Sequence, residues 1–506
     1  MRSHWPAIGV CLLLAACGDS DSDADGGTDA ATASEDGGTD AGPSAGDDGG
    51  TGSVDDGTDG EADDDDGSDG DTDTSSGGVT EPPPPSAACD DVQLPERTGA
   101  EIVVSPGGDG MVMVDGAATT LRAVVSGASS GDTILLEDGT YTFAEAGEGS
   151  YSGLYFTQPD VTLRSASGDA SAVDLDSRYL SHGGSSATVT IAATGIVIAD
   201  ITVRRSIFHL IHLWAEGDGA LIHNVHMIDG GQQFLKASPG EGTVDDVEVS
   251  CSTFLMTDEG RDNVWGYGPQ DGSTQCYTGG IDTHDSRDWV VHDSYFDGIY
   301  CDATGVQRPA HGQFPELRDG MTYNGGLAEH GVHMWESAEG SGHVIARNRI
   351  VNCARGIGVG FVDPVYGSSV VNNMVFSEHP GSGQHDVGIS VERAVDTLVA
   401  HNTVYFSHPD SYGAGIEYRW DTTTNLTMHG NLTNREIRAR NDAVATTSDN
   451  VMVAEDGWFV DGANGDLHLA DCSAAGEAMN IDGVGDDFDS ETRADPTSPG
   501  ADECAR

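Results

Sequence analysis

The fold is decided by a strand such as Leu398-Val-Ala-His-Asn402, followed by a second strand such as Gly415-Ile-Glu-Tyr-Arg419. This pair of strands recurs with variations between Ile196 and Arg438, for example as Leu221-Ile-His-Asn224 and Gly331-Val-His-Met-Trp335. The Asn or Asp residues that end the first strand lie 24 to 29 positions apart where nothing is inserted. A fixed period of this size, built only of short strands, predicts an all-β solenoid, namely a parallel β-helix.

The residue types agree with this prediction. Alternation with a period of two places Val, Ile and Leu inside each coil and their neighbours outside. Asn and Asp tolerate the left-handed backbone of a tight corner, and their stacked side chains can satisfy one another's amides. The 70 glycines suit a chain that turns two or three times per coil. A β-sandwich with regular turns is the less favoured alternative.

The two ends of the repeat region resemble those of known bacterial proteins. A short amphipathic helix is expected at Thr120–Val125, and it precedes Gly131-Asp-Thr-Ile-Leu-Leu136 and Gly139-Thr-Tyr-Thr-Phe143. This order resembles the opening of bacterial right-handed parallel β-helix proteins, in which the helix plugs the first coil. Residues 487–493 and 500–503 are similar to the closing segment of the same proteins. The resemblance implies one right-handed parallel β-helix domain, which we place at residues 89–506.

The N-terminus has the features of an export signal. A charged start and a short apolar run lead to Leu14-Ala15-Ala16-Cys17, which resembles the bacterial lipobox. The resemblance implies removal of residues 1–16 and attachment of lipid to Cys17, with the protein held at the outer membrane or cell surface. A plain secretory signal, with Cys17 as an ordinary thiol, is the alternative.

Residues 17–88 are expected to form a disordered, acidic tether. From Gly18 to Glu81 there are 22 acidic residues and no basic one, and removing them still leaves roughly −41 of the formal charge of −63. Such a segment cannot bury enough apolar surface to offset its ordering entropy. An acidic folded domain makes nucleic acid an improbable partner. We expect a monomer that contacts a polysaccharide and, through its lipid, a membrane.

Seven cysteines remain once Cys11 and Cys17 are set aside. In an exported protein these are expected to form disulfides rather than metal sites. We predict that Cys251 pairs with Cys276 and that Cys301 pairs with Cys353, so that each bond pins an inserted loop to a nearby coil, and that one thiol is left over or bridges elsewhere.

Two insertions interrupt the period, because Cys251 and Asp293 are 42 residues apart and Asp293 and Asn348 are 55 apart. Both occur at the same phase of the repeat, so residues 256–279 and 298–330 are expected to project from one edge of the solenoid. Long loops on a rigid scaffold tend to carry function. These loops contain Arg and aromatic residues that suit carboxylates and sugars: Arg261, Trp265, Tyr267, Tyr277, Arg308, His311, Arg318, Tyr323 and His330.

Alignment of the second strands predicts an outward-facing polar stripe. Coils are about 4.8 Å apart, so residues one period apart become neighbours. The predicted stripe is His212, Lys236, Asp282 and His333, flanked by Trp214, His284 and Trp335, with Glu417 and Arg419 further along. Lys236 is the only lysine among 22 basic residues, which singles it out for a pairing or functional role.

The stripe and loops predict action on a uronate-containing polysaccharide. β-Elimination, or C5-epimerisation, needs a base and a group that neutralises the uronate carboxylate. We assign Lys236, His333 or His284 as base, and Arg261 or Arg419 as carboxylate clamp. Ca²⁺ would bind Asp282 and Glu417. Sugar contacts are expected from Trp214, Trp265, Trp335, Tyr267, Tyr277 and His212.

One segment of the stripe resembles a known family. Residues 233–238, Gln-Phe-Leu-Lys-Ala-Ser, resemble the lysine strand of the chondroitinase-B and alginate lyase family, but its Arg-His-Gly element is missing from this sequence. A glycosidase with two facing carboxyls, a zinc site formed by His212, His284, His333 and Asp282, and a non-enzymatic glycan-binding or adhesin lipoprotein are the alternatives.

Overall fold

The computed structural model describes residue 89 and residues 92–146, 150–180, 182, 187–240, 242–264, 276–301, 327–381 and 385–504. The expected signal peptide, the expected lipidation site Cys17, the expected tether, and Trp265, Tyr267, Arg308, His311, Arg318 and Tyr323 lie outside these residues. Within the described part of the chain, no helix has the length and hydrophobicity needed to cross a membrane.

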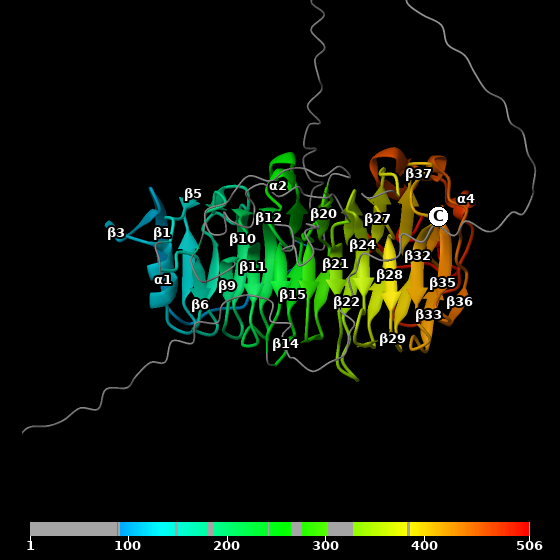
Figure 1. Ribbon diagram of the computed structural model, residues 1–506, viewed down its shortest axis with the longest axis horizontal. Coiled ribbons are helices and arrows are strands. Elements are labelled where there is room, and N and C mark those ends of the chain that lie inside the picture. The colour runs from blue at the N-terminus through cyan, green and yellow to red at the C-terminus, as the bar shows by residue number, and fades with distance from the viewer. Residues whose placement is uncertain are drawn as a thin grey trace, which may run out of the picture. The chain divides into compact units, whose positions relative to one another are not determined.

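The strands stack along one axis in three rows (Figure 1). Neighbours within a row pair in parallel, as in β11 (His209–Leu213) with β13 (Leu235–Ala237) and β12 (Leu221–Gly230) with β16 (Thr253–Leu255). The long strands β10 (Val197–Ser206) and β12 pass from row one into row two. This is the right-handed parallel β-helix that the repeat predicted.

Row one contains β1 (Glu101–Gly108), β4 (Thr133–Leu136), β7 (Thr162–Ser165), β10 (Val197–Ser206), β12 (Leu221–Gly230), β15 (Glu248–Ser250), β19 (Val290–His292), β22 (Val344–Ala346), β26 (Ser369–Val371), β30 (Leu398–Ala400), β33 (Leu426–His429) and β36 (Ala445–Ser448). Row two contains β5 (Gly139–Thr142), β8 (Val173–Asp176), the second halves of β10 and β12, β16 (Thr253–Leu255), β20 (Tyr295–Asp297), β23 (Arg349–Val351), β27 (Met374–Ser377), β31 (Thr403–Phe406) and β34 (Leu432–Thr433). Row three contains β6 (Leu154–Phe156), β9 (Ala187–Ile191), β11 (His209–Leu213), β13 (Leu235–Ala237), β17 (Ile281–Thr283), β21 (His330–Met334), β24 (Arg355–Val359), β28 (Ile389–Glu392), β32 (Ala414–Arg419) and β35 (Glu436–Arg440).

Smaller elements lie at the corners and ends of the stack. The two-stranded pairs are β2 (Met111–Val114) with β3 (Ala117–Thr119), β14 (Val244–Asp245) with β18 (Ser286–Arg287), β25 (Val365–Tyr366) with β29 (Ala394–Val395), and β37 (Phe459–Asp461) with β38 (Asp466–Leu469). The helices are α1 (Leu121–Gly127), α2 (Asp258–Asp262), α4 (Cys472–Ala475), η2 (Asp456–Trp458) and η3 (Gly462–Asn464).

The core is formed by the inward-facing positions of the three rows. In row three, Ile211, Leu235, Ile281 and Val332 occupy one register and are fully buried. Burying an aliphatic side chain of this size contributes about 1.5–3 kcal/mol. The same register turns the next residue of each strand to the opposite face, which fixes the position of the polar stripe.

The corner between rows one and two confirms the predicted amide stacking. Asn348, Asn373, Asn402, Asn431 and Asn450 form a ladder in which each Nδ2 donates to the next Oδ1 at 2.9–3.0 Å. One detail of the prediction is wrong for these coils. The left-handed backbone lies one position earlier, for example at Asn372 and His401, whereas at Asp200 and Asp293 it lies on the expected residue itself. The ladder asparagines therefore serve as hydrogen-bonding partners rather than as the residues that turn the chain.

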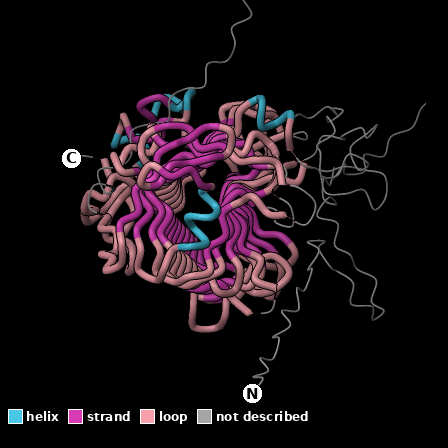
Figure 2. Tube along the Cα trace, turned by 90° about the vertical axis from the view of Figure 1, so that its left-hand side faces the viewer, coloured by secondary structure: helices cyan, strands magenta, loops and turns pink. Residues whose placement is uncertain are grey.

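Helix α1 lies across the N-terminal opening of the coil (Figure 2). The Thr120 side chain caps the helix by accepting from the Ala123 N–H at 3.1 Å, and Leu121 and Val125 are buried in the core. The expected capping helix is therefore present, one residue later than predicted. It covers apolar side chains that the first coil would otherwise leave in water.

The closing segment folds back against earlier coils. The buried guanidinium of Arg493 donates to Oδ1 of Asn372 at 2.8 Å and to the carbonyls of Gly500 and Ala501 at 2.9 Å each. The N–H of Ala501 donates to Oγ1 of Thr403 at 2.8 Å. The C-terminal residues thus brace the corner between rows one and two.

The predicted disulfide pairing is wrong. The bonds join Cys89 with Cys251, Cys276 with Cys301, and Cys472 with Cys504. Cys353 is the buried free thiol among the described residues. The pairing of Cys276 with Cys301 shows why the prediction failed. The two insertions leave from β16 and β20 and return to β17 and β21, which are neighbours in register, so one insertion is bonded to the other rather than to a coil.

Candidate functional site on row three

Row three brings the predicted stripe together. His212 pairs in register with Lys236, Lys236 with Asp282, and Asp282 with His333. Their side chains face away from the core but are almost inaccessible, with exposed fractions of 2–6%. The stripe is therefore a packed polar network and not a row of solvated side chains.

Asp282 is the centre of this network. The ammonium of Lys236 contacts Oδ2 of Asp282, and the indole N–H of Trp335 donates to Oδ1 at 2.6 Å. Two imidazoles complete the surroundings: Nε2 of His284 lies 3.5 Å from Oδ2, and Nδ1 of His333 lies 3.4 Å from Oδ1. The contact between His333 and Asp282 is close enough for an ion pair but is not a regular hydrogen bond, because Nδ1 of His333 has no hydrogen-bonding partner of good geometry.

These contacts control the ionisation of Asp282. Burial alone would raise its pKa, but Lys236 and the interactions with His284 and His333 outweigh burial and hold the pKa well below the usual value. The carboxylate is thus ionised at neutral pH. It can orient the imidazole of His284, since Nε2 of that ring points toward it.

Two histidine pairs with the same spacing in the sequence flank the Lys236–Asp282 ion pair. His209 and His212 lie on β11, next to Lys236, with ring centroids 5.3 Å apart. His330 and His333 lie on β21, next to Asp282, with ring centroids 4.3 Å apart. Burial lowers the pKa of His209 to about 4, and burial together with nearby cationic groups holds the pKa of His212 and His330 well below the usual value.

His284 is the most accessible imidazole of the network, with 30% of its side chain exposed. Its ring stacks on Trp335 with centroids 3.9 Å apart. The aromatic face fixes the ring plane and Asp282 faces one nitrogen, so the other nitrogen is the one available to a substrate. Trp214 occupies the equivalent place beside His212, with ring centroids 4.6 Å apart.

Glu417 and the arginines form a separate cluster on the same row. Arg438 and Arg440 donate to the buried Glu417 carboxylate at 2.6 and 3.0 Å, and Tyr412 donates at 3.2 Å. Arg419 lies 3.9 Å from Glu417 and 3.4 Å from Glu392. The strands β21, β24 and β28 separate β17 from β32, so Glu417 is four strand steps, about 19 Å, from Asp282. Arg419 is therefore too distant to clamp a sugar that is bound at His284.

The residues expected to hold Ca²⁺ do not suit that ion. Calcium takes six to eight oxygen ligands, whereas Asp282 is surrounded by nitrogen donors and Glu417 by guanidiniums. The zinc alternative fails as well, because His212 lies two strands away from Asp282. Another group does place three potential ligand atoms within 4.8 Å of one another: Glu329, His330 and His333.

The remaining predicted residues are only partly associated with the network. Arg261 lies in the last turn of α2, and its guanidinium donates to the carbonyls of Met256 and Gly298 at 3.1 and 2.9 Å. It also stacks over Tyr300, so its donors are used within the region where the insertions begin. Tyr277 is half-buried at the end of the first insertion.

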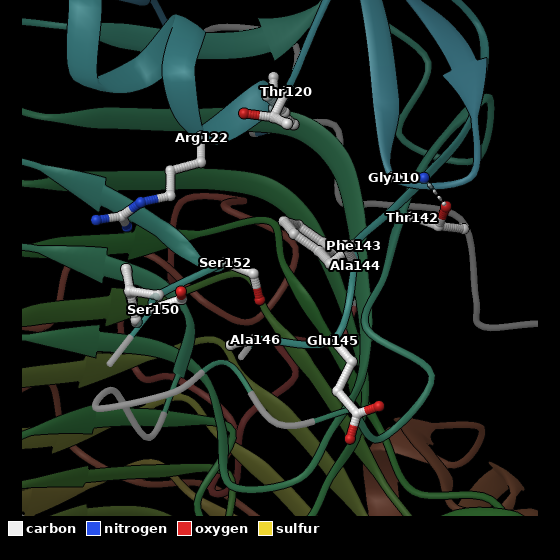
Figure 3. A pocket seen from close by; sticks show the side chains of 12 residues that line it. Gly110, Thr120, Arg122, Thr142, Phe143, Ala144, Glu145, Ala146, Ser150 and Ser152 are labelled. Atoms are coloured by element: carbon white, nitrogen blue, oxygen red, sulfur yellow. Dashed lines mark hydrogen bonds between the residues drawn. The ribbon is translucent and has the colours of Figure 1, made fainter. Parts of the chain in front are cut away.

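A pocket lies elsewhere, at the N-terminal end of the stack. It measures about 230 Å³ and is lined by the start of α1 and by the chain after β5, including Thr120, Arg122, Phe143 and Ser152 (Figure 3). Arg122 spans one side and donates to the carbonyl of Gly153 at 2.9 Å. The pocket shares no residue with the Asp282 network.

Sequence reasoning missed His209, the role of His330 and the arginine pair Arg438 and Arg440. The spacing offered a signal, because His209-Leu-Ile-His212 and His330-Gly-Val-His333 share a His-x-x-His pattern around the aligned core residues Ile211 and Val332. His330 was instead placed inside an insertion. Arg438 continues the Glu417 position onto the next strand.

Comparison with known proteins finds similarity in fold. A pectate lyase, Pel9A, has a TM-score of 0.44 at 12% identity, covering 82% of this chain and 99% of its own. XylC in complex with xylose has a TM-score of 0.43 at 9% identity, covering 79% and 98%. A PL6 family polysaccharide lyase from Pseudopedobacter saltans has a TM-score of 0.35 at 13% identity, covering 73% and 96%. No family model and no curated protein matches the sequence. At such identities the likeness is one of fold and not of activity.

Proposed function

We propose that the protein binds an acidic, uronate-containing polysaccharide along row three and acts on it by proton abstraction, with His284 as the base. The arrangement around Asp282 carries this proposal. His284 faces an ionised carboxylate, stacks on an indole and keeps 30% of its side chain in solvent. Lys236 and His333 are nearly inaccessible behind it. Of the three predicted bases, His284 is therefore the one that a polymer lying on the row reaches.

The chemistry follows from this geometry. A neutral imidazole with Nε2–H directed at Asp282 presents the Nδ1 lone pair outward, and Asp282 stabilises the imidazolium once the proton is taken. In β-elimination the proton leaves C5 of the uronate and its electron pair forms the C4–C5 double bond. The C4–O bond breaks, and the leaving oxygen takes a proton from water. Delivery of a proton from water to the opposite face of C5, with the imidazolium releasing its proton to solvent, gives epimerisation instead.

The preference for an acidic polymer rests on charge and on aromatic side chains. Trp214 and Trp335 place two indoles along the row, and flat aromatic faces suit sugar rings. The arginine cluster around Glu417 places three guanidiniums, those of Arg419, Arg438 and Arg440, on the same row. The chain as a whole has a formal net charge of −63 and repels anions, so an anionic polymer would bind where guanidiniums gather on the row.

The place of action is part of the proposal. Cleavage before Cys17 and lipid attachment to its sulfur would leave the β-helix at the end of an acidic tether, at the bacterial outer membrane or cell surface. Mass spectrometry of the protein from a membrane fraction tests this, since a diacylated or triacylated Cys17 changes the mass of the N-terminal peptide.

A glycan-binding module without turnover is the second candidate. The observation in its favour is the mutual satisfaction of Lys236, Asp282 and Trp335, which is typical of a buried structural network. In such a module His284 would contact sugar without accepting a proton.

One experiment separates the two candidates. The purified protein is incubated with alginate, pectate and chondroitin, and ultraviolet absorbance reports unsaturated uronate while proton NMR reports epimerised residues. Turnover that is lost in His284→Gln supports the enzyme. Binding that persists in wild type and variant without either product supports the module.

A further inference from the structure

The imidazole of His330 has an unsatisfied nitrogen in a buried place. Nε2 lies 3.1 Å from Oγ of Ser390, while Nδ1 is buried without a hydrogen-bonding partner. The residue is only 7% exposed. If Nε2–H donates to Ser390, Nδ1 carries a lone pair that neither protein nor bulk solvent satisfies. A buried acceptor in this state destabilises the fold unless a partner binds it.

The imidazole of His333 faces the carboxylate of Asp282. Its Nδ1 faces Oδ1 of Asp282 at 3.4 Å, which leaves Nε2 as the other nitrogen of the ring. An imidazole that turns one N–H toward a carboxylate and the other nitrogen toward a metal is the common arrangement in metal sites, because the carboxylate fixes the ring and raises its basicity.

A carboxylate completes the group. One potential ligand atom from each of Glu329, His330 and His333 lies within 4.8 Å of the others. Gly358 on the next strand makes room for both rings, since a Cβ there would lie 2.7 Å from Nε2 of His330 and 2.8 Å from Cδ2 of His333. Two imidazoles are thereby packed side by side next to a half-buried glutamate.

We propose that Glu329, His330 and His333 bind a divalent metal ion of the zinc type. Two imidazole nitrogens and one carboxylate oxygen form a ligand set that zinc accepts, and three protein ligands leave a fourth tetrahedral position for water or a ligand oxygen. Calcium and magnesium prefer oxygen donors and bind such a set poorly. The inference does not depend on the proposed function, because it uses neither His284 nor a polysaccharide.

The neighbouring histidine pair provides a matched control. His209 and His212 have the same spacing on β11, but Nδ1 of His209 already bonds the carbonyl of Gln233 at 2.8 Å and Nε2 of His212 lies 2.9 Å from Oγ of Ser238. Within the described residues, no grouped carboxylate accompanies that pair.

The test uses the full chain, freed of metal with a chelator and then dialysed. Zn²⁺, Co²⁺ and Ca²⁺ are added separately, and thermal unfolding, titration calorimetry and the visible spectrum of the Co²⁺ form are recorded. The variants are His330→Gln, Glu329→Gln and His209→Gln. Glu329→Gln alters a half-buried side chain, and so keeps the test valid if His330→Gln folds poorly.

We expect one Zn²⁺ per chain to raise the unfolding temperature of the wild type and of His209→Gln, with at least tenfold weaker binding in His330→Gln and Glu329→Gln. Co²⁺ should give an intense visible band in the wild type that both of these variants lose, and Ca²⁺ should give no shift. Equal Zn²⁺ affinity in wild type and Glu329→Gln, or an absence of stoichiometric binding in the wild type, would overturn the proposal.

Discussion

The histidine pairs on β11 and β21 have the same spacing, lie on the same row and flank the same ion pair, yet their surroundings differ. His209 and His212 each have a neutral hydrogen-bonding partner. His330 keeps a buried nitrogen without a partner and lies beside Glu329, and His333 faces Asp282. The first pair is therefore part of a packed polar surface, whereas the second pair provides nitrogen atoms that can bind a metal ion. Sequence spacing sets where a side chain lies, and its partners decide what it can do.

Neutralising the carboxylate of Asp282, which lies between the two histidine pairs, should have the largest effect on stability. Asp282→Asn leaves the ammonium of Lys236 buried without its carboxylate, and breaking a buried ion pair on one side costs about 3–5 kcal/mol. We expect a loss of that size in the free energy of unfolding, measured by urea denaturation. Asp285→Asn, at an exposed position three residues further on, serves as the control and should change stability by less than about 0.5 kcal/mol. Equal stability of the two variants would contradict the central role of Asp282.

The two pairs should respond differently to loss of a histidine in metal-free protein. His209→Leu removes the bond to the buried carbonyl of Gln233 and should cost about 1–3 kcal/mol. His330→Leu also removes one hydrogen bond, that of Nε2 with Ser390, but with it goes the Nδ1 that is already unsatisfied, so its cost should be smaller by about 1 kcal/mol. Urea denaturation in the presence of a chelator measures both. A larger loss for His330→Leu would show that its Nδ1 has a partner in the metal-free protein.

Acid should destabilise the protein through His209. Burial lowers the pKa of His209 to about 4, whereas an unfolded histidine titrates near about 6.5. Between these values the unfolded chain binds a proton that the folded chain does not, so the stability contributed by neutral His209 is complete above about pH 6.5 and is lost as the pH falls toward 4. His209→Leu should flatten the dependence of the unfolding temperature on pH in this window. An unchanged slope would contradict the buried, neutral state of His209.

The serine partners should give the smallest difference. Ser238→Ala and Ser390→Ala each remove one hydroxyl that faces a histidine, and each should cost about 0.5–1.5 kcal/mol. Only Ser390→Ala should also weaken Zn²⁺ binding, since it frees the His330 ring to turn. Titration calorimetry with Zn²⁺ compares the two variants, and equal affinities would separate Ser390 from the metal site.

Much of this arrangement could be predicted from the sequence because, in a solenoid, residues one repeat apart become neighbours in space. The register of His212, Lys236, Asp282 and His333 followed from aligning the aliphatic positions before them. The disulfides did not follow, since two inserted segments can meet each other beyond the repeat, as Cys276 and Cys301 do. The hydrogen bonds around Asp282 could not be predicted either. The repeat places Trp335 near Asp282, but it does not determine the direction of the indole N–H. The sequence pattern also did not predict that Lys236 is buried, and a buried lysine cannot contact a polysaccharide that lies on the strand face.

The most direct test of the proposed function compares turnover in the wild type and in His284→Gln. His226→Gln, on β12 of another row, is the matched control. We predict that the wild type and His226→Gln form unsaturated or epimerised uronate from one acidic polysaccharide, and that His284→Gln loses about 10²–10⁴-fold in kcat/KM with unchanged thermal stability. Full activity of His284→Gln would contradict the account, and so would absence of both products from wild-type protein that binds the polysaccharide.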